Sequence, residues 1–362
     1  MEKNIKNLTF SEYVSPGHPD KVADYISQYI LDRYIEMDPG VRYAVEVLIK
    51  GEMVVLAGEV TSSVWFSKDE YKMFVVEALT EIGYTENYYS KWGSNVINPF
   101  NIEVITNIQE QSPEISQGVN TDGWGDQGIF FGYAFPGDEG DESMMPLSHA
   151  YAKWLCHDLY MNAKTKGIGG IDIKTEIVMD GNKIQKIIAA VPCLDENEEG
   201  LVLQEINNWT SSLVKEGEEP KIILNGTGSY QMHGPIADSG ITGRKLAVDL
   251  YGGCGQIGGG AIIKDGTKAD VSLNLFARKL AKTWAVKTGK PIKVSLACCI
   301  GKREVDYRIE SPCGDVIACD TFLLSPKVLI KILGLDKPIY TSMHTFGLFG
   351  KYQKDKAWES PE

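Results

Sequence analysis

The chain repeats one arrangement of a helix followed by two strands three times along its length. Each copy begins with apolar residues at helical spacing, at 21–37, 147–164 and 272–287. Two strand-like runs follow, at 42–50 and 53–60, 171–179 and 183–190, and 292–300 and 304–309. The turns between these runs contain Gly51, Gly181 and Gly301, at intervals close to one third of the chain.

This repetition predicts an α/β (α+β) fold of three similar domains with internal pseudo-threefold symmetry, each a β-sheet covered by helices. A second helix follows each strand pair, near 69–82, 203–214 and 326–333. We expect an N-terminal domain over 1–110, a central domain over 111–234 and a C-terminal domain over 235–362. The alternative is an ordinary α+β protein, in which helices and hairpins also alternate.

Composition narrows the possible partners and location. The 362 residues carry a formal net charge of −13, which argues against nucleic acid or an anionic membrane as the main partner. No apolar run approaches the roughly 20 residues that span a bilayer, and the first ten residues lack a signal-peptide core. The seven cysteines lack metal-type spacing. We therefore expect a cytoplasmic protein with reduced cysteines.

Three segments carry phosphate- and metal-binding chemistry. In Gly258–Asp270, three glycines permit close backbone approach, Lys264 and Lys268 supply positive charge, and Asp270 is a hard oxygen donor that suits Mg2+. His18-Pro19-Asp20-Lys21 places similar groups at the start of a helix, which attracts anions. The third segment is Gly125–Gly128. The alternatives are a solvated turn for the first segment and a simple helix start for the second.

Six motifs in order give the chain a specific resemblance. They are Gly-His-Pro-Asp-Lys (17–21), Gly-Glu-Val-Thr-Ser (58–62), Gln-Ser-Pro-Glu-Ile (111–115), Gly-Asp-Gln-Gly (125–128), Gly-Ile-Thr-Gly-Arg-Lys (240–245) and Gly-Gly-Gly-Ala (258–261). Together they resemble the S-adenosylmethionine synthetases (methionine adenosyltransferases). The match extends from about residue 8 to Phe-Gly-Leu-Phe-Gly-Lys at 346–351.

The resemblance implies a three-domain fold, in agreement with the repeat, and a reaction. ATP and L-methionine would give S-adenosylmethionine by sulfur attack on the ribose C5′, and the triphosphate would then be hydrolysed to pyrophosphate and phosphate. Two Mg2+ ions per site and one K+ would be the cofactors. The working unit would be a homodimer or a dimer of dimers, with active sites shared across the interface.

The resemblance also assigns roles to residues. The catalytic and phosphate-binding group would be His18, Lys174, Arg244, Lys245 and Lys264. The remaining ATP contacts would be Asp172, Ser229, Tyr230, Asp238 and Ala261. Methionine would contact Glu59, Gln111, Asp238 and Lys268. Asp20 and Asp270 would hold Mg2+ and Glu46 would hold K+, while Asp126 would lie on the partner's side of the shared site.

Taken alone, several of these residues have simpler explanations. Lys174 lies in an alternating strand, where a lysine normally faces solvent, and Glu46 interrupts another strand. Asp238 and Asp265 suit turns. Where the family usually carries arginine or histidine, this chain has Ser229, Gln256 and Ile257, and Val271. The phosphate and metal core is complete, but these peripheral cations are absent.

The segment Gln111–Gly125 is rich in polar and turn-forming residues. Composition suggests a surface loop, whereas the resemblance makes it the lid of the active site, shorter than in common bacterial members. Trp124 would anchor its far end.

Two other functions compete with the synthetase. One is a divergent tripolyphosphatase, against which Glu59, Gln111 and Asp238 argue. The other is a catalytically silent, nucleotide-binding regulatory subunit, against which His18, Lys174, Lys264 and Asp270 argue.

Overall fold

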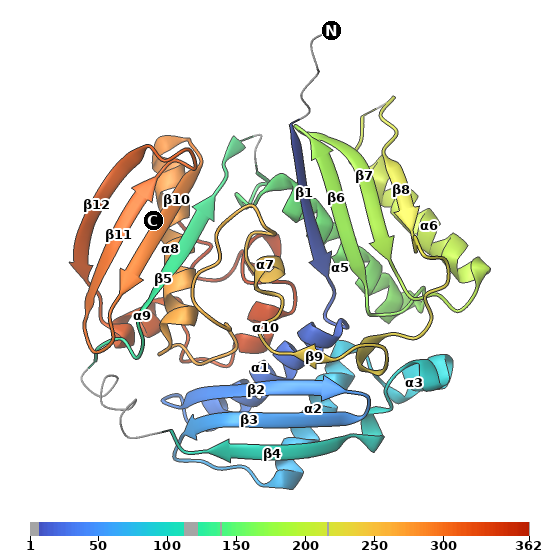
Figure 1. Cartoon of the computed structure of the whole chain (residues 1–362), viewed down its shortest axis with the longest axis horizontal. Helices are drawn as coiled ribbons and strands as arrows, with labels where there is room; N and C mark the ends of the chain where they lie inside the picture. The colour runs from blue at the N-terminus through green and yellow to red at the C-terminus, as the bar shows by residue number, and fades with distance from the viewer. Residues whose placement is uncertain (1–6, 112–121, 138–139, 216, 362) are drawn as a thin grey trace.

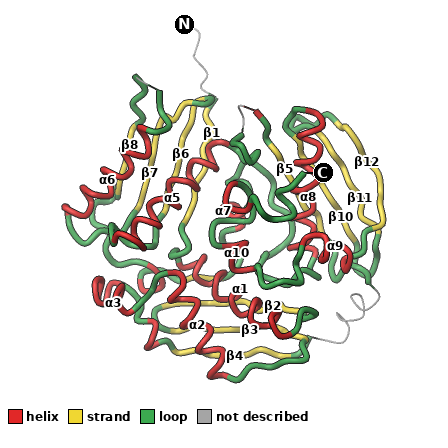
Figure 2. Tube along the Cα trace, turned by 180° about the vertical axis from the view of Figure 1, so that it is seen from behind, coloured by secondary structure: helices red, strands yellow, loops and turns green. Residues whose placement is uncertain are grey.

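The computed structural model describes residues 7–111, 122–137, 140–215 and 217–361. Three four-stranded sheets lie around a common centre, with their helices on one side, as Figure 1 and the reverse view in Figure 2 show. The predicted three-sheet α/β class is confirmed. Within the described ranges, no helix combines the length and apolar character needed to cross a membrane.

The first sheet has the strand order β4-β3-β2-β9. Its strands are β2 (Arg42–Lys50), β3 (Met53–Thr61), β4 (Glu103–Gln109) and β9 (Gly240–Ile241). The helices of this unit are α1 (Pro19–Met37), α2 (Lys68–Ile82) and α3 (Glu86–Trp92). Ser67 and Glu70 begin α2 with reciprocal side-chain-to-backbone hydrogen bonds, which satisfy N–H groups that the helix start leaves free.

The second sheet has the order β1-β6-β7-β8. Its strands are β1 (Leu8–Val14), β6 (Lys174–Asp180), β7 (Lys183–Ala190) and β8 (Lys221–Leu224). Its helices are α5 (Leu147–Lys166) and α6 (Glu196–Ser211). The buried residues of β6 and β7 alternate with partly exposed ones, so one face of this sheet packs on α5 and the other is open.

The third sheet has the order β12-β11-β10-β5. Its strands are β5 (Gly128–Ala134), β10 (Ile292–Cys298), β11 (Glu304–Glu310) and β12 (Val316–Leu323). Its helices are α8 (Ala269–Thr288) and α9 (Pro326–Leu333). Two further short helices, α7 (Leu246–Asp249) and α10 (Tyr340–His344), lie at the centre between the three sheets (Figures 1 and 2).

Each sheet contains one strand that is remote in sequence from its neighbours. β1 pairs with β6, β9 pairs with β2, and β5 pairs with β10. The predicted boundaries after residues 110 and 234 divide the chain into contiguous segments, whereas the sheets are assembled across those boundaries.

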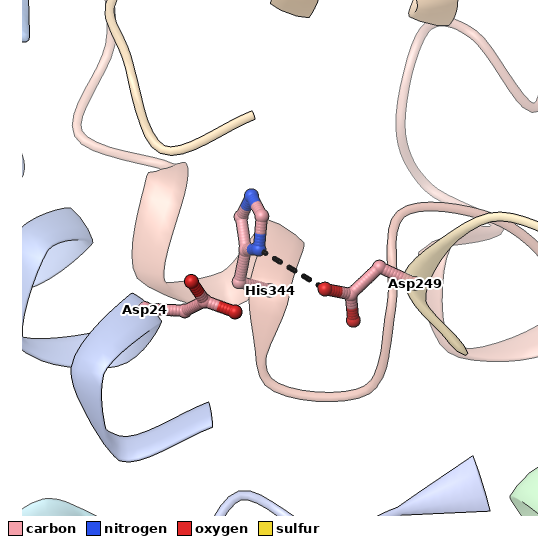
Figure 3. Close-up of side chains that lie close together, drawn as sticks. All are labelled: Asp24, Asp249 and His344. Atoms are coloured by element: carbon pink, nitrogen blue, oxygen red, sulfur yellow. Dashed lines mark ion pairs between the residues drawn. The ribbon is translucent and has the colours of Figure 1, made fainter. Parts of the chain in front are cut away.

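A buried charge cluster at the centre joins α1 to the short helices α7 and α10. Lys21 Nζ lies 2.6 and 2.7 Å from the two carboxylate oxygens of Asp249, and 3.6 Å from Asp24. Asp24, Asp249 and His344 are arranged closely enough to hold a metal ion, as Figure 3 shows. The Lys21 ammonium already neutralises this carboxylate cluster, so we interpret it as a structural ion pair.

A second buried ion pair fastens the end of the chain to α8. Arg278 donates to both carboxylate oxygens of Glu359, and neither side chain is more than 1% exposed. Lys282 also donates to Glu359, at 2.8 Å. We expect Glu359→Ala to lower the free energy of unfolding by about 3–5 kcal/mol, because it leaves the buried guanidinium without its counter-ion. Urea unfolding followed by tryptophan fluorescence measures this change.

The control is Glu36→Ala, which breaks the exposed Arg33–Glu36 pair. It should change stability by less than about 1 kcal/mol. Equal effects of the two substitutions would contradict the structural role of Glu359.

Candidate active site

His18 begins helix α1 and is held in one orientation. Its Nδ1 accepts a hydrogen bond from the backbone N–H of Asp20 at 3.1 Å, so in the neutral ring the hydrogen is on Nε2. The preceding loop is fixed by Ser15, which donates to Ile171 O and accepts from Ile173 N. Gly17 permits this close approach, since a Cβ there would lie 2.3 Å from Ile171 O.

The surroundings of His18 keep its ring neutral. The side chain is 3% exposed, and burial together with the nearby cations Lys245 and Lys174 lowers its pKa to about 2. The opposing influence of Asp238 is smaller. His18 is therefore suited to donate a hydrogen bond from Nε2 and unsuited to act as a cation.

A cavity of about 420 Å3 opens beside His18. Six of the residues assigned from the family resemblance line it: His18, Asp172, Lys174, Ser229, Tyr230 and Asp238. Asp172 and Lys174 belong to the second unit and His18 ends the loop before α1. The other three lie in the segment between β8 and β9. Distant segments therefore converge on one cavity of mixed polarity, which suits a polar ligand with an apolar ring.

Asp172 and Tyr230 form one wall of this cavity. Asp172 is 4% exposed, and its Oδ2 accepts from the Gly234 N–H at 2.8 Å. Its other oxygen has no hydrogen-bond partner among the described residues, so a buried acceptor is available for a donor on a ligand. Burial raises the pKa of Asp172 to about 6. The Tyr230 hydroxyl donates to Asp172 O at 3.2 Å.

Asp20 holds the segment that carries Arg244 and Lys245. Its carboxylate accepts from the Ile241 N–H at 3.0 Å and from Lys245 Nζ, and it lies 3.5 Å from Arg244 Nε. Arg244 is half exposed and Lys245 is one-fifth exposed, which leaves both cations accessible to a ligand.

A second group of assigned residues lies at the start of α8. Asp270 accepts from Lys264 Nζ at 2.8 Å and from the Gly260 N–H at 2.7 Å. Ala261 packs on Gly243, one residue before Arg244. Lys268 is the residue that precedes α8. The predicted glycine, lysine and aspartate of Gly258–Asp270 are thus brought together, whereas Asp265 accepts from two backbone N–H groups as a turn residue.

The two predicted Mg2+ ligands occupy equivalent places in the repeat. Asp20 is the second residue of α1, and Asp270 is the second residue of α8. Each carboxylate is paired with a predicted phosphate-binding lysine, Lys245 or Lys264. The corresponding residue of α5 is Ser148, which offers no charge. The repeat therefore supplies two carboxylates suited to a cation, each at a helix start and each neutralised by an ammonium.

The assigned methionine ligands lie around the first sheet. Glu59 is exposed on β3 and lies opposite Gln109 of β4. Gln111 is buried, and its Oε1 has no hydrogen-bond partner within the described part of the chain. Asp126 is exposed next to β5 and accepts from the Gln127 N–H. Trp124 is fully buried and pairs with Gly301 and Lys302, as an anchor requires. Residues 112–121 of the predicted lid lie outside the described residues.

Glu46, the predicted K+ ligand, is exposed on β2 and accepts from the Thr242 hydroxyl. Thr242 in turn contacts the β2 backbone through its N–H and its hydroxyl. One carboxylate beside one hydroxyl is a partial donor set for a monovalent cation, so the residues present fit such an ion only in part.

The assigned residues therefore form two groups on one chain. Within residues 7–111, 122–137, 140–215 and 217–361, hydrogen bonds and ion pairs link Asp20 to His18, Arg244 and Lys245, and link Lys264 to Asp270. In these ranges none joins His18, Lys174 or Asp238 to Lys264, Asp270 or Glu59. Glu46 and Glu59 project from the open face of the first sheet, opposite the face that packs on helices. Exposed apolar residues accompany them on open sheet faces, among them Phe10, Ile105 and Ile129.

Some residues of the site could not be found from sequence motifs. Asn225 lines the cavity and bonds both the N–H and the carbonyl of Val191. Tyr84, Tyr88 and His233 lie behind the cavity wall. For these three residues the one sequence signal was the position of His233, which precedes a Gly-Pro pair and lies five residues before Asp238. Lys21, predicted beside the anion site, is instead buried against Asp249.

Comparison with known proteins gives a consistent result over nearly the whole chain. The family description "S-adenosylmethionine synthetase, N-terminal domain" matches residues 6–113, and "S-adenosylmethionine synthetase, C-terminal domain" matches residues 232–360. The S-adenosylmethionine synthases of Mycoplasmopsis pulmonis and Pseudothermotoga lettingae are 34% and 36% identical, with 98% of this chain covered in each case and 96% and 97% of the relatives.

A solved structure agrees with these sequence relatives. The fold matches an S-adenosylmethionine synthetase from Campylobacter jejuni, described as unusual, with a TM-score of 0.85 and 32% identity over 98% of this chain and 97% of that one. Fold, site chemistry and relatives thus define an adenosyl-transferring enzyme. The chain belongs to the S-adenosylmethionine synthetase family, the methionine adenosyltransferases.

The neutral state of His18 leads to a spectroscopic prediction. With a pKa of about 2, the ring should stay in the Nε2–H form at every pH at which the protein remains folded. Because an unfolded histidine takes up a proton near pH 6.5, this group should reduce folding stability as the pH falls below 6.5. Long-range 1H–15N NMR of labelled histidine, with His18→Asn for assignment, checks the tautomer. A His18 signal that titrates between pH 5 and 8 would contradict the proposed environment.

Proposed function

We propose that this enzyme joins the methionine sulfur to the ribose C5′ of ATP. The C–S bond forms as the C5′–O bond breaks, which gives the sulfonium product and triphosphate, and water then cleaves the triphosphate to pyrophosphate and phosphate. The observation that carries the proposal is the neutral, oriented His18 at a cavity that Lys174 also lines. A weak neutral nucleophile needs this kind of orientation and charge stabilisation at the leaving group.

The residues supply complementary parts of this chemistry. His18 would donate from Nε2 to the oxygen that leaves C5′. Lys174, Arg244 and Lys245 would neutralise the departing triphosphate, because their positive charges lie beside the cavity or next to Asp20. Preorganised donors of this kind are effective because they need little reorganisation as charge develops.

The adenosine end would occupy the wall that Asp172 and Tyr230 form. The unpartnered Asp172 carboxylate oxygen suits a ribose hydroxyl or an adenine amino group, and the Tyr230 ring offers a stacking face. Glu59 and Gln111 would bind the methionine amino and carboxylate groups, together with Asp238 and Lys268. Buried Gln111 has an unpartnered acceptor, which supports this assignment.

Asp20 and Asp270 would hold two Mg2+ ions, which supply positive charge to the phosphates when bound. Hard carboxylates suit Mg2+, and the ammonium groups of Lys245 and Lys264 now neutralise both. Metal binding would release the two lysines toward the phosphates. Glu46, with its partial donor set, would contribute to a K+ site.

We expect Asp20→Asn and Asp270→Asn to raise the Mg2+ concentration at half-maximal activity by about tenfold or more, because each removes a charged ligand. Mn2+ binding, measured by electron paramagnetic resonance, should weaken in parallel. The control is Asp265→Asn, a nearby turn residue that keeps a hydrogen-bonding oxygen. Metal binding that is unaltered in both site variants would count against the assignment.

We further propose that two copies of the chain share each active site, with the open sheet faces against each other. Among the described residues no hydrogen bond or ion pair joins His18, Lys174 or Asp238 to Lys264, Asp270 or Glu59, and apolar side chains such as Phe10 and Ile129 are exposed on the open sheet faces. In this arrangement the His18, Lys174, Asp238 and Arg244 group faces Glu59, Gln111, Asp126, Lys264 and Asp270 of the partner.

The shared site gives a complementation prediction. His18→Ala and Lys264→Ala subunits, each with little activity alone, should form heterodimers with one intact site and one doubly damaged site. Activity should reappear when the two variants are refolded together, and native mass spectrometry can verify the mixed dimer. Verified heterodimers without activity would contradict a site built from both chains.

One assay separates this function from its competitors. Incubation with ATP and methionine, with separate measurement of S-adenosylmethionine and phosphate, should yield both products. Phosphate without S-adenosylmethionine would indicate a tripolyphosphatase, and neither product would indicate a silent regulatory subunit. The cytoplasm, where ATP and Mg2+ are available, is the proposed location, and the seven free cysteines agree with it.

A further inference from the structure

A buried aromatic group lies directly behind the cavity wall. It consists of Tyr84 just before α3, Tyr88 and Trp92 within α3, and His233 from the segment after Tyr230. Tyr84–Tyr88, Tyr88–His233 and Trp92–His233 pack edge to face, with the Trp92 and His233 centroids 4.7 Å apart. His233 is fully buried and Tyr88 is partly buried against the core. This aromatic group is outside every role assigned above.

Hydrogen bonds fix the direction of each donor in the group. The Ile171 N–H donates to the Tyr88 hydroxyl oxygen at 2.9 Å. The Tyr88 hydroxyl lies 2.5 Å from His233 Nε2, and His233 Nδ1 lies 2.7 Å from the Gln231 carbonyl oxygen. Because that carbonyl only accepts, Nδ1 carries the hydrogen and Nε2 accepts from Tyr88. Burial, the largest influence, lowers the pKa of His233 to about 4, in agreement with this neutral form.

Both ends of this chain of hydrogen bonds lie next to residues that line the cavity. Ile171 directly precedes Asp172, and Gln231 directly follows Tyr230. The hydrogen bonds therefore tie the segment before β6 to the segment between β8 and β9, which are 60 residues apart in sequence at Ile171 and Gln231. Tyr84 extends the same support, since its hydroxyl donates to Gly17 O at 2.7 Å, next to His18.

We propose that Tyr88 and His233 are positioning residues for the nucleotide: their hydrogen bond sets the distance between Asp172 and Tyr230. The inference rests on the proposed function, in which these two groups contact the adenosine end of ATP. Neither Tyr88 nor His233 lines the cavity. Their effect is exerted through the backbone of the residues next to the two contact groups.

Tyr88→Phe tests this inference because it removes the hydroxyl and keeps the ring. It leaves the Ile171 N–H and His233 Nε2 without partners, so we expect the dissociation constant for adenosine 5′-(β,γ-imido)triphosphate to rise about tenfold. The KM for ATP should rise similarly, while the KM for methionine should stay within about twofold. Isothermal titration calorimetry and steady-state kinetics of the full-length enzyme measure these values.

A second pair of variants separates positioning from general loss of packing. His233→Gln keeps an oxygen that can accept from Tyr88 and should retain more nucleotide affinity than His233→Phe. The Tyr88→Phe, His233→Phe double variant should bind little worse than either single variant, since both remove the same bond. Tyr160→Phe is the matched control, because it loses another buried hydroxyl bond, to Ile82 O, away from the cavity.

The outcomes are distinguishable. Nucleotide affinity that is unchanged in Tyr88→Phe, or reduced equally in Tyr160→Phe, would overturn the positioning role. If the unaltered enzyme neither bound the analogue nor formed S-adenosylmethionine, the proposed function would fail, and this inference with it.

Discussion

The start of α1, over residues 19–24, is the constraint on which the rest of the structure depends. It lies at the centre, where the three sheets meet, and its polar side chains hold other parts of the chain. Asp20 and Asp24 accept from the backbone N–H groups of Ile241 and Gly243, and Lys21 neutralises Asp249. Removing one partner from such a buried pair typically costs several kcal/mol, because the other charge is left uncompensated. The same helix start orients His18, so assembly of the fold and assembly of the site are one event.

The threefold repeat explains why the site has two similar halves. The second residue of both α1 and α8 is an aspartate, and each aspartate forms an ion pair with a lysine from a loop. The third equivalent helix, α5, has Ser148 at that position, and the neighbouring His149 is buried against Ser11. Two of the three equivalent helix starts therefore carry a charged pair, which suits the metal and phosphate roles proposed for them, while Ser148 and His149 at the third are buried.

The departures from the family pattern concern the edge of the site. Ser229 lines the cavity where the family usually carries arginine, and Val271, which follows the metal aspartate, is fully buried. A buried valine adds to the core instead of supplying a charge. The central groups, His18, Lys174, Lys264 and the two aspartates, are all present, so in the proposed mechanism the differences would alter how strongly the phosphates are neutralised more than which reaction the residues suit.

Sequence alone determined the repeating helix-and-hairpin units, because hydrophobic periodicity and turn glycines are local signals. It also predicted the main site residues, since glycine, lysine and aspartate in short motifs carry their chemistry with them, and those residue roles stay predictions. Only the tertiary structure decided that β1, β5 and β9 complete sheets across the predicted boundaries, because strand pairing depends on partners far away in the chain. Likewise only the structure showed Lys21 buried against Asp249, and the contact between Tyr88 and His233, which are 145 residues apart. The identity of a side chain is local, but its charge state and its partners depend on which distant groups surround it.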